Sequence, residues 1–249
     1  MNNTKAIFIK QLTSLIKVPS MIVQGVIFLL IALAFTFFMS ADDEYECFDC
    51  IPAYVCEPCE IIEAARFRPI INSTTGLFAV IFVGLALVGS ASAIVLEDKT
   101  TTNLRFMAMA DVKPFEYLPG TVAAMMIVVF FMLIPFALVG GYFGREMFWF
   151  MSVGFVGGFV SVLLGSVIGL SKVPALSMPI SMLLGLGPSL GSLNESVANA
   201  IRFTFIQQVN IAFADLNADL SSNFLIIGVN GIIVFMVFVL MHRKNKFNL

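Results

Sequence analysis

The chain has 249 residues, of which 59% are hydrophobic and only 12% are charged, and its mean hydropathy is +0.97. This composition excludes a soluble domain of ordinary make-up and predicts an integral membrane protein. The net charge is −2, and the basic residues are few and scattered. Because they form no basic stripe, the sequence gives no sign of a nucleic-acid-binding surface.

The first segment, residues 1–19, combines three lysines with apolar residues at helical spacing, among them Phe8, Leu12 and Leu15. This pattern predicts an amphipathic helix along the cytoplasmic leaflet, although an ordinary basic flank of a span would also explain the lysines. Residues 21–39 are apolar and long enough to cross a membrane. We expect an uncleaved signal anchor here, because the apolar core is long and Met39 with Ala41 makes a poor cleavage site.

Six apolar segments in all have the composition of membrane spans. They are residues 21–39, 73–96, 120–142, 148–170, 174–190 and 224–241. The segment 174–190 is interrupted by prolines and glycines, which predicts a broken or short helix. We therefore expect one all-α transmembrane domain over residues 1–249, with six spans.

The polar segments between these spans differ in charge. The termini, residues 97–119 and residues 171–173 together carry about +6, whereas residues 41–72, 144–146 and 191–222 carry about −8. Basic residues accumulate on the cytoplasmic side of membrane proteins. The sequence therefore predicts a multi-pass protein of the cell membrane with both termini in the cytosol.

The external segment 191–222 contains a helix-start signal. Ser192-Leu193-Asn194-Glu195 has the spacing of a capping box. It predicts one amphipathic helix that begins at Ser192 and carries Phe203, Phe205 and Ile206.

Residues 97–119 form the only long polar interruption on the basic side between two spans. Within it, residues 102–110 predict a short helix, and Pro114 predicts a turn after it. This helix is too short and too charged to cross hydrocarbon, yet Leu104 and Phe106 are too apolar for a solvated loop. We expect it to lie at the membrane surface and to dock onto another molecule.

The predicted spans hold almost no ionisable residue, which argues against a carrier driven by protons or sodium. Residues 148–170 instead carry small residues on one helical face, which we interpret as a packing face for another helix. Glycine is common in membrane helices, which would explain any one of these residues alone. The packing face consists of Gly154, Gly158, Ser161, Gly165 and Gly169.

The chain contains no catalytic or nucleotide-binding motif. Residues 165–172 come nearest to a P-loop, but the spacing is wrong and the glycines lie within a span. His242 is the only histidine and lies in the basic tail, so no Ser/His/Asp or Cys/His site can form. We expect no enzymatic activity and no cofactor in this chain.

Residues 97–120 resemble the cytoplasmic segment between the second and third spans of ABC-2 type permeases, although Thr101 stands where members of that family often have glycine. The shared features are an acidic start, a threonine, a leucine-containing helix and a proline-containing turn. The layout of six spans, the N-terminal amphipathic helix and the external helix before the last span extend the resemblance over the whole chain.

This resemblance implies an architecture like that of type V exporters and a permease that pairs with a second copy or a paralogue. It also implies a separate ATPase subunit that binds ATP and Mg²⁺, and export of an amphipathic peptide or a lipophilic compound. The helix in residues 102–110 would be the coupling helix that docks on the ATPase. The implied interface residues are Thr102, Leu104, Arg105, Phe106, Met107, Met109 and Lys113.

Four cysteines, Cys47, Cys50, Cys56 and Cys59, lie together in the acidic external loop. Outside the cytosol thiols oxidise, and we expect two disulfides. The spacing also permits a zinc site with four thiolates or a redox-active thiol pair. The alternative to a transporter is therefore a membrane sensor, an immunity protein or a thiol-redox protein that acts through this loop.

Overall fold

The computed structural model describes residues 3–17, 20–41, 74–101, 114–171, 173–193, 195–216 and 218–246. Within these ranges the chain is helical, with short connections and no strands. Residues 74–81 begin a continuous helix that includes a π-helical turn, η1. The helices are α1 (Asn3–Lys17), α2 (Ser20–Ala41), η1 (Phe82–Ala86), α4 (Leu87–Thr100), α6 (Pro114–Val139), α7 (Arg145–Leu170), η2 (Pro174–Leu176), α8 (Ser177–Leu193), α9 (Glu195–Ile201), α10 (Phe205–Ala214) and α11 (Ser221–Lys246).

Five of the described helices are long and apolar enough to cross a membrane, which confirms an all-helical, membrane-embedded protein at this level. The stretches concerned are Ser20–Phe38, Thr74–Thr100, Glu116–Val139, Arg145–Leu170 and Ser221–Met241.

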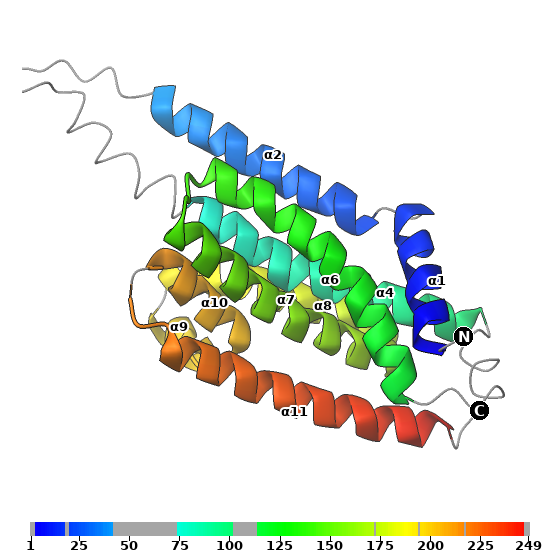
Figure 1. Cartoon of the computed structure of the whole chain (residues 1–249). Coiled ribbons are helices and arrows are strands. Elements are labelled where there is room, and N and C mark those ends of the chain that lie inside the picture. The colour runs from blue at the N-terminus through cyan, green and yellow to red at the C-terminus, as the bar shows by residue number, and fades with distance from the viewer. Residues whose placement is uncertain are drawn as a thin grey trace, which may run out of the picture.

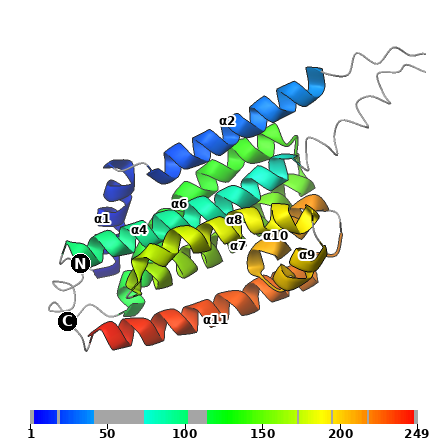
Figure 2. The ribbon, with the colours of Figure 1, turned by 180° about the vertical axis from the view of Figure 1, so that it is seen from behind.

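The remaining predicted span corresponds to η2 and α8. α8 has 17 residues, which at about 1.5 Å per residue is a little short of the ~30 Å hydrocarbon core. It is nevertheless a single helix with Pro188 inside it, and it runs beside the helix of residues 74–100 between the same two ends of the molecule (Figures 1 and 2).

The helix of residues 74–100 and α7 form the centre of the bundle, and both are mostly buried within the protein. α2 and α11 lie at the periphery and expose most of their apolar surface (Figure 1). α1 crosses one end of the bundle and packs against α6, and α9 and α10 lie at the other end (Figures 1 and 2). The end that carries α1 is also the end at which α11 finishes, so the described parts of the two basic terminal segments lie at one end (Figure 1).

Stacked aromatic rings hold α10 in the bundle. The ring of Phe150 in α7 stacks on Phe213 in α10 and on Tyr142, with centroid distances of 4.4 and 4.8 Å. Burial raises the pKa of Tyr142 well above its usual value, with a further contribution from the charge of Glu146, so the phenol stays neutral at physiological pH.

The polar segment 97–119 is shorter in the structure than the sequence predicts. Helix α4 continues past Leu96 to Thr100, so Asp98 is helical and not part of a loop. At the other side, Pro114 is the first residue of α6, a position that proline tolerates because the first N–H of a helix has no intrahelical partner. Four residues of the predicted loop thus extend one span, and six extend the next.

The predicted helix start at Ser192 is wrong, because Ser192 lies inside α8. The external segment also forms two short helices rather than one, with a break at Arg202, Phe203 and Thr204. Thr204 caps α10, since its hydroxyl accepts a hydrogen bond from the backbone N–H of Gln207 at 3.4 Å. Phe203 is exposed in the break, whereas Phe205 and Ile206 are buried in α10.

The π-helical turn brings two backbones into contact. A Cβ atom at Gly84 would lie 2.9 Å from Cα of Gly185 in α8, and one at Gly185 would lie 2.6 Å from Cβ of Leu85. Only glycine permits this approach, and a π-helical turn adds a local bulge at the same place. Gly185, one of the glycines that interrupt the predicted span, is therefore a point at which the backbone of α8 packs directly on the bundle.

Candidate functional site

The small residues of α7 lie where two helices approach closely. A Cβ atom at Gly165 would lie 2.4 Å from the carbonyl oxygen of Val88 in α4. One at Gly169 would lie 2.7 Å from the carbonyl oxygen of Ser92, one helical turn further along α4. No side chain fits between α4 and α7 at these two positions.

The rest of the predicted packing face contacts several elements. Gly158 faces Leu87 of α4 and a valine of α6, and Gly154 faces Leu133 of α6. Ser161 is fully buried, and its hydroxyl has no hydrogen-bond partner in the described part of the chain. A Cβ atom at Gly157, which the sequence does not single out, would lie 2.5 Å from the Val209 side chain of α10.

A buried carboxylate joins three helices at the end of the bundle that carries α1. Asp98, in the last turns of α4, is 4% exposed. Lys10 Nζ donates to its Oδ1 at 2.5 Å, and Gln11 Nε2 donates to Oδ2 at 2.6 Å, both from α1. The hydroxyl of Tyr117 in α6 donates to the same Oδ2 at 3.0 Å. We call these four residues the Asp98 cluster.

The two partners of the ion pair in the Asp98 cluster differ in their exposure to solvent. The Lys10 side chain is 42% exposed, whereas the Asp98 side chain is 6% exposed. A buried carboxylate needs hydrogen bonds to replace its lost hydration, and Gln11 and Tyr117 supply them from buried positions. The neutral donors therefore carry much of the stabilisation, while water screens the ion pair.

A neighbouring lysine ties α4 to α7 at the same end. Lys99 Nζ donates to the carbonyl oxygens of Leu170 at 3.3 Å and Ser171 at 2.8 Å. These carbonyls belong to the C-terminal end of α7, where a positive charge is favourable.

Helices α1 and α6 also approach closely at Gly120 of α6, where an added Cβ atom would lie 2.9 Å from the Ile7 side chain of α1.

The Asp98 cluster adjoins the segment predicted to dock on an ATPase, since α4 and α6 lie directly before and after it in the chain. The predicted interface residues themselves lie outside the described residues. They are Thr102, Leu104, Arg105, Phe106, Met107, Met109 and Lys113.

The predicted disulfide or metal site also lies outside the described residues, since Cys47, Cys50, Cys56 and Cys59 all fall between residues 42 and 73. Among the residues that the structure describes, no group of three or more His, Cys, Asp or Glu side chains could hold a metal ion.

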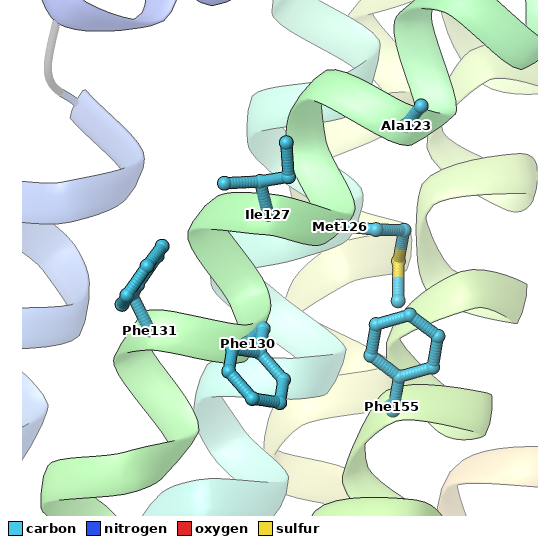
Figure 3. A pocket seen from close by; sticks show the side chains of 6 residues that line it. All are labelled: Ala123, Met126, Ile127, Phe130, Phe131 and Phe155. Atoms are coloured by element: carbon cyan, nitrogen blue, oxygen red, sulfur yellow. The ribbon is translucent and has the colours of Figure 1, made fainter.

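An apolar groove of about 370 Å³ lies between α6 and α7. Figure 3 shows Met126 of α6 beside Phe155 of α7, with Phe130 and Phe131 further along α6. All six of its lining residues are apolar, so the groove offers shape and apolar contact but no side-chain hydrogen bond to orient a ligand.

Sequence reasoning missed the Asp98 cluster, although part of its signal is present. The charges Glu97, Asp98 and Lys99 directly follow an apolar run, and residues 1–19 have helical periodicity. Helical periodicity extended by one turn would have placed Asp98 on the same face as Val95 and Ala91, which are both buried. Its partners lie 88, 87 and 19 residues away, and no local pattern indicates them.

A scan of protein-family models and a search of curated proteins both find no match to this chain.

Proposed function

We propose that the chain is the membrane-spanning permease subunit of an ATP-driven ABC transporter of the ABC-2 type. It acts in the cell membrane with both termini in the cytosol, and it pairs with a second copy or a paralogue. A separate subunit hydrolyses ATP and docks on residues 102–113. The substrate class is an amphipathic peptide or a lipophilic compound, and the direction is export.

The Asp98 cluster is the observation that carries the proposal. It joins α4 and α6, the helices on either side of residues 102–113, and it adds α1 to the same unit through Lys10 and Gln11. A docking segment transmits force only if the elements that hold it move together. The hydrogen bonds to Asp98 give these helices a common anchor, so a displacement of the segment reaches both.

The arrangement of charges supports the orientation. Lys10 and Lys99 lie at the end of the bundle that holds the Asp98 cluster, and α11 finishes at that end with a basic tail (Figure 1). Basic residues at the ends of spans favour the cytosol. An ATPase that docks on residues 102–113 would then reach ATP in the cytosol.

The test is purification of the chain from its native membrane in mild detergent, followed by identification of stoichiometric partners by mass spectrometry. The wild type should bring down a P-loop ATPase, and the double variant Leu104→Asp, Phe106→Asp should lose it. Phe203→Asp is the control, because it places the same charge on an aromatic residue that is 71% exposed at the other end of the bundle.

If no ATPase accompanies the wild type under conditions that preserve other membrane complexes, the transporter assignment is wrong. If the ATPase stays bound to the double variant as it does to the wild type and to the Phe203→Asp control, residues 102–113 are not the docking segment.

A further inference from the structure

A second cavity, of about 440 Å³, lies at the end of the bundle opposite α1, between the first turns of α7 and α11. Its lining combines aromatic rings with one positive and one negative side chain, unlike the apolar groove between α6 and α7. The lining residues are Arg145, Trp149, Ala218, Asp219, Leu220, Ser221 and Phe224.

The helices that form this cavity indicate its level in the membrane. Arg145 is the first residue of the span Arg145–Leu170, and Trp149 lies one turn further on the same face. Ser221 is likewise the first residue of the span Ser221–Met241. The first turn of a span lies at the level of the lipid head groups, where tryptophan is enriched.

Two aromatic rings, Trp149 of α7 and Phe224 of α11, line the cavity. The rings of Trp149 and Phe224 are in contact, with centroids 6.2 Å apart at an interplanar angle of 50°. The ring of Phe148 contacts that of Trp149, with centroids 5.5 Å apart, and Phe148 exposes 64% of its surface. The apolar surface next to the cavity is therefore available to acyl chains.

The two charged side chains of the cavity do not form an ion pair with each other. The structure shows no ion pair between Arg145 and Asp219 in the part of the chain that it describes, although both line this cavity. Asp219 Oδ1 accepts a hydrogen bond from the backbone N–H of Ser221 at 3.0 Å. This bond lowers the pKa of Asp219, so the side chain stays a carboxylate at neutral pH.

We propose that this cavity binds the head group of a zwitterionic phospholipid, with the phosphate against Arg145 and the ammonium against Asp219. An arginine guanidinium matches phosphate oxygens, and a carboxylate accepts hydrogen bonds from a primary ammonium. The face of Trp149 adds a favourable site for the ammonium. An anionic lipid without an amine would satisfy Arg145 but leave its head group beside the Asp219 carboxylate.

Trp149 is the only tryptophan of the chain, so its fluorescence reports on this cavity alone. The full chain is reconstituted in phosphatidylglycerol vesicles that contain a small fraction of phosphatidylethanolamine with brominated acyl chains, which quench tryptophan on contact. The comparison uses vesicles of the same overall lipid composition in which an equal amount of phosphatidylglycerol carries the bromine instead. Brominated phosphatidylethanolamine should quench Trp149 more strongly and should reach saturation at a low fraction.

Arg145→Gln and Asp219→Asn each remove one charge, and each should weaken the preference for phosphatidylethanolamine by up to about fivefold, as expected for an exposed charged contact. Asp219→Asn keeps an oxygen that can accept the Ser221 N–H, so the start of α11 is preserved. Arg202→Gln and Asp215→Asn are the matched controls, because they remove the same charges at the same end without changing a lining residue, and the amide oxygen of Asp215→Asn can still accept the Ala218 N–H. Both controls should quench as the wild type does.

Equal quenching by the two brominated lipids, or stronger quenching by phosphatidylglycerol, overturns the proposal. So does a preference that survives in both charge variants. Soluble glycerophosphoethanolamine at the same concentration should not relieve the quenching, and relief would assign the cavity to a water-soluble ligand instead. Lipid binding here and ATPase docking at the opposite end are independent, so either can fail without the other.

Discussion

At Gly165 one added methyl group would meet the backbone of the neighbouring helix. The nearest atoms are the carbonyl oxygen of Val88 at 2.4 Å and Cβ of Ala91 at 2.7 Å, and neither can rotate away. Alanine is a better helix former than glycine by about 1 kcal/mol, but overpacking costs about 1–3 kcal/mol, so the collision decides the outcome. The α4–α7 contact therefore depends on the absence of a side chain.

Gly165→Ala should lower the free energy of unfolding by about 2 kcal/mol, measured by chemical or thermal unfolding in one detergent. Gly228→Ala is the matched control, because a Cβ atom at Gly228 on α11 has no neighbour within 4 Å. Ser161→Ala should be neutral or slightly stabilising, since it removes a buried hydroxyl without a partner in the described structure. Equal effects of Gly165→Ala and Gly228→Ala would contradict the close contact.

The members of the Asp98 cluster should contribute unequally to stability. Asp98→Ala should cost about 3 kcal/mol, because it removes the acceptor that the buried Gln11 and Tyr117 side chains share. Lys10→Ala should cost less than about 1 kcal/mol, since that side chain is 42% exposed. Unfolding of both variants under the same conditions measures the difference. A cost for Lys10→Ala as large as that for Asp98→Ala would show that the ion pair dominates.

On the scale of the helices, α8 and the π-helical turn η1 cross at a point formed by two glycines. Gly84 in the π-helical turn faces Gly185, and this contact brings together two segments about 100 residues apart in the chain. A side chain at either position would hold the backbones apart. The attachment of α8 is therefore sensitive to one methyl group.

Gly84→Ala should move α8 away from η1 and destabilise the protein by about 2 kcal/mol. The displacement can be measured as a lower yield of disulfide cross-linking between Gly89→Cys and Ser181→Cys, with the native cysteines replaced by serine. A Cβ atom at Gly89 lies 4.0 Å from Ser181 Oγ, so this pair is close in the wild type. Gly187→Ala, whose Cβ would meet Ile201 at an ordinary 3.9 Å, should leave the cross-link intact. An unchanged yield in Gly84→Ala would contradict the crossing point.

At this scale, hydropathy and helical periodicity predict that the helices exist but not the residues at which they end. The apolar run that begins at residue 73 predicts a span, yet it gives no reason for α4 to continue to Thr100. Asp98 continues the helix because partners on α1 and α6 satisfy its carboxylate. Ser192 matches a helix-start pattern, but α8 continues past it to Leu193. At Asp98, tertiary contacts outweigh the local signal.

For the whole molecule, the charge pattern predicts that successive spans alternate in direction. The described helices run back and forth between two ends, and α8 takes part in this alternation (Figures 1 and 2). The glycines of α7 could be assigned to a packing face from the sequence, because their spacing is visible there. The helices that they contact could not, since pairing across the bundle leaves no trace in a single sequence.

The alternation predicts opposite accessibility at the two ends of α8. In a background without native cysteines, Phe203→Cys should react from outside intact cells with a membrane-impermeant maleimide. Val173→Cys should react only after permeabilisation, although its side chain is 52% exposed. Labelling of both positions from the same side would show that α8 enters and leaves the membrane on one side, with five spans in total.

The position of the Asp98 cluster in the chain has a consequence for the order of assembly. Lys10 and Gln11 precede Asp98 by 88 and 87 residues, and Tyr117 follows Asp98 by 19. During synthesis α1 therefore emerges long before the carboxylate that binds it, and the site is complete only when the start of α6 has emerged. The first helix to be made therefore waits for its partners until the start of α6 has been synthesised, and until then its apolar face has to be covered by the membrane surface or by a chaperone.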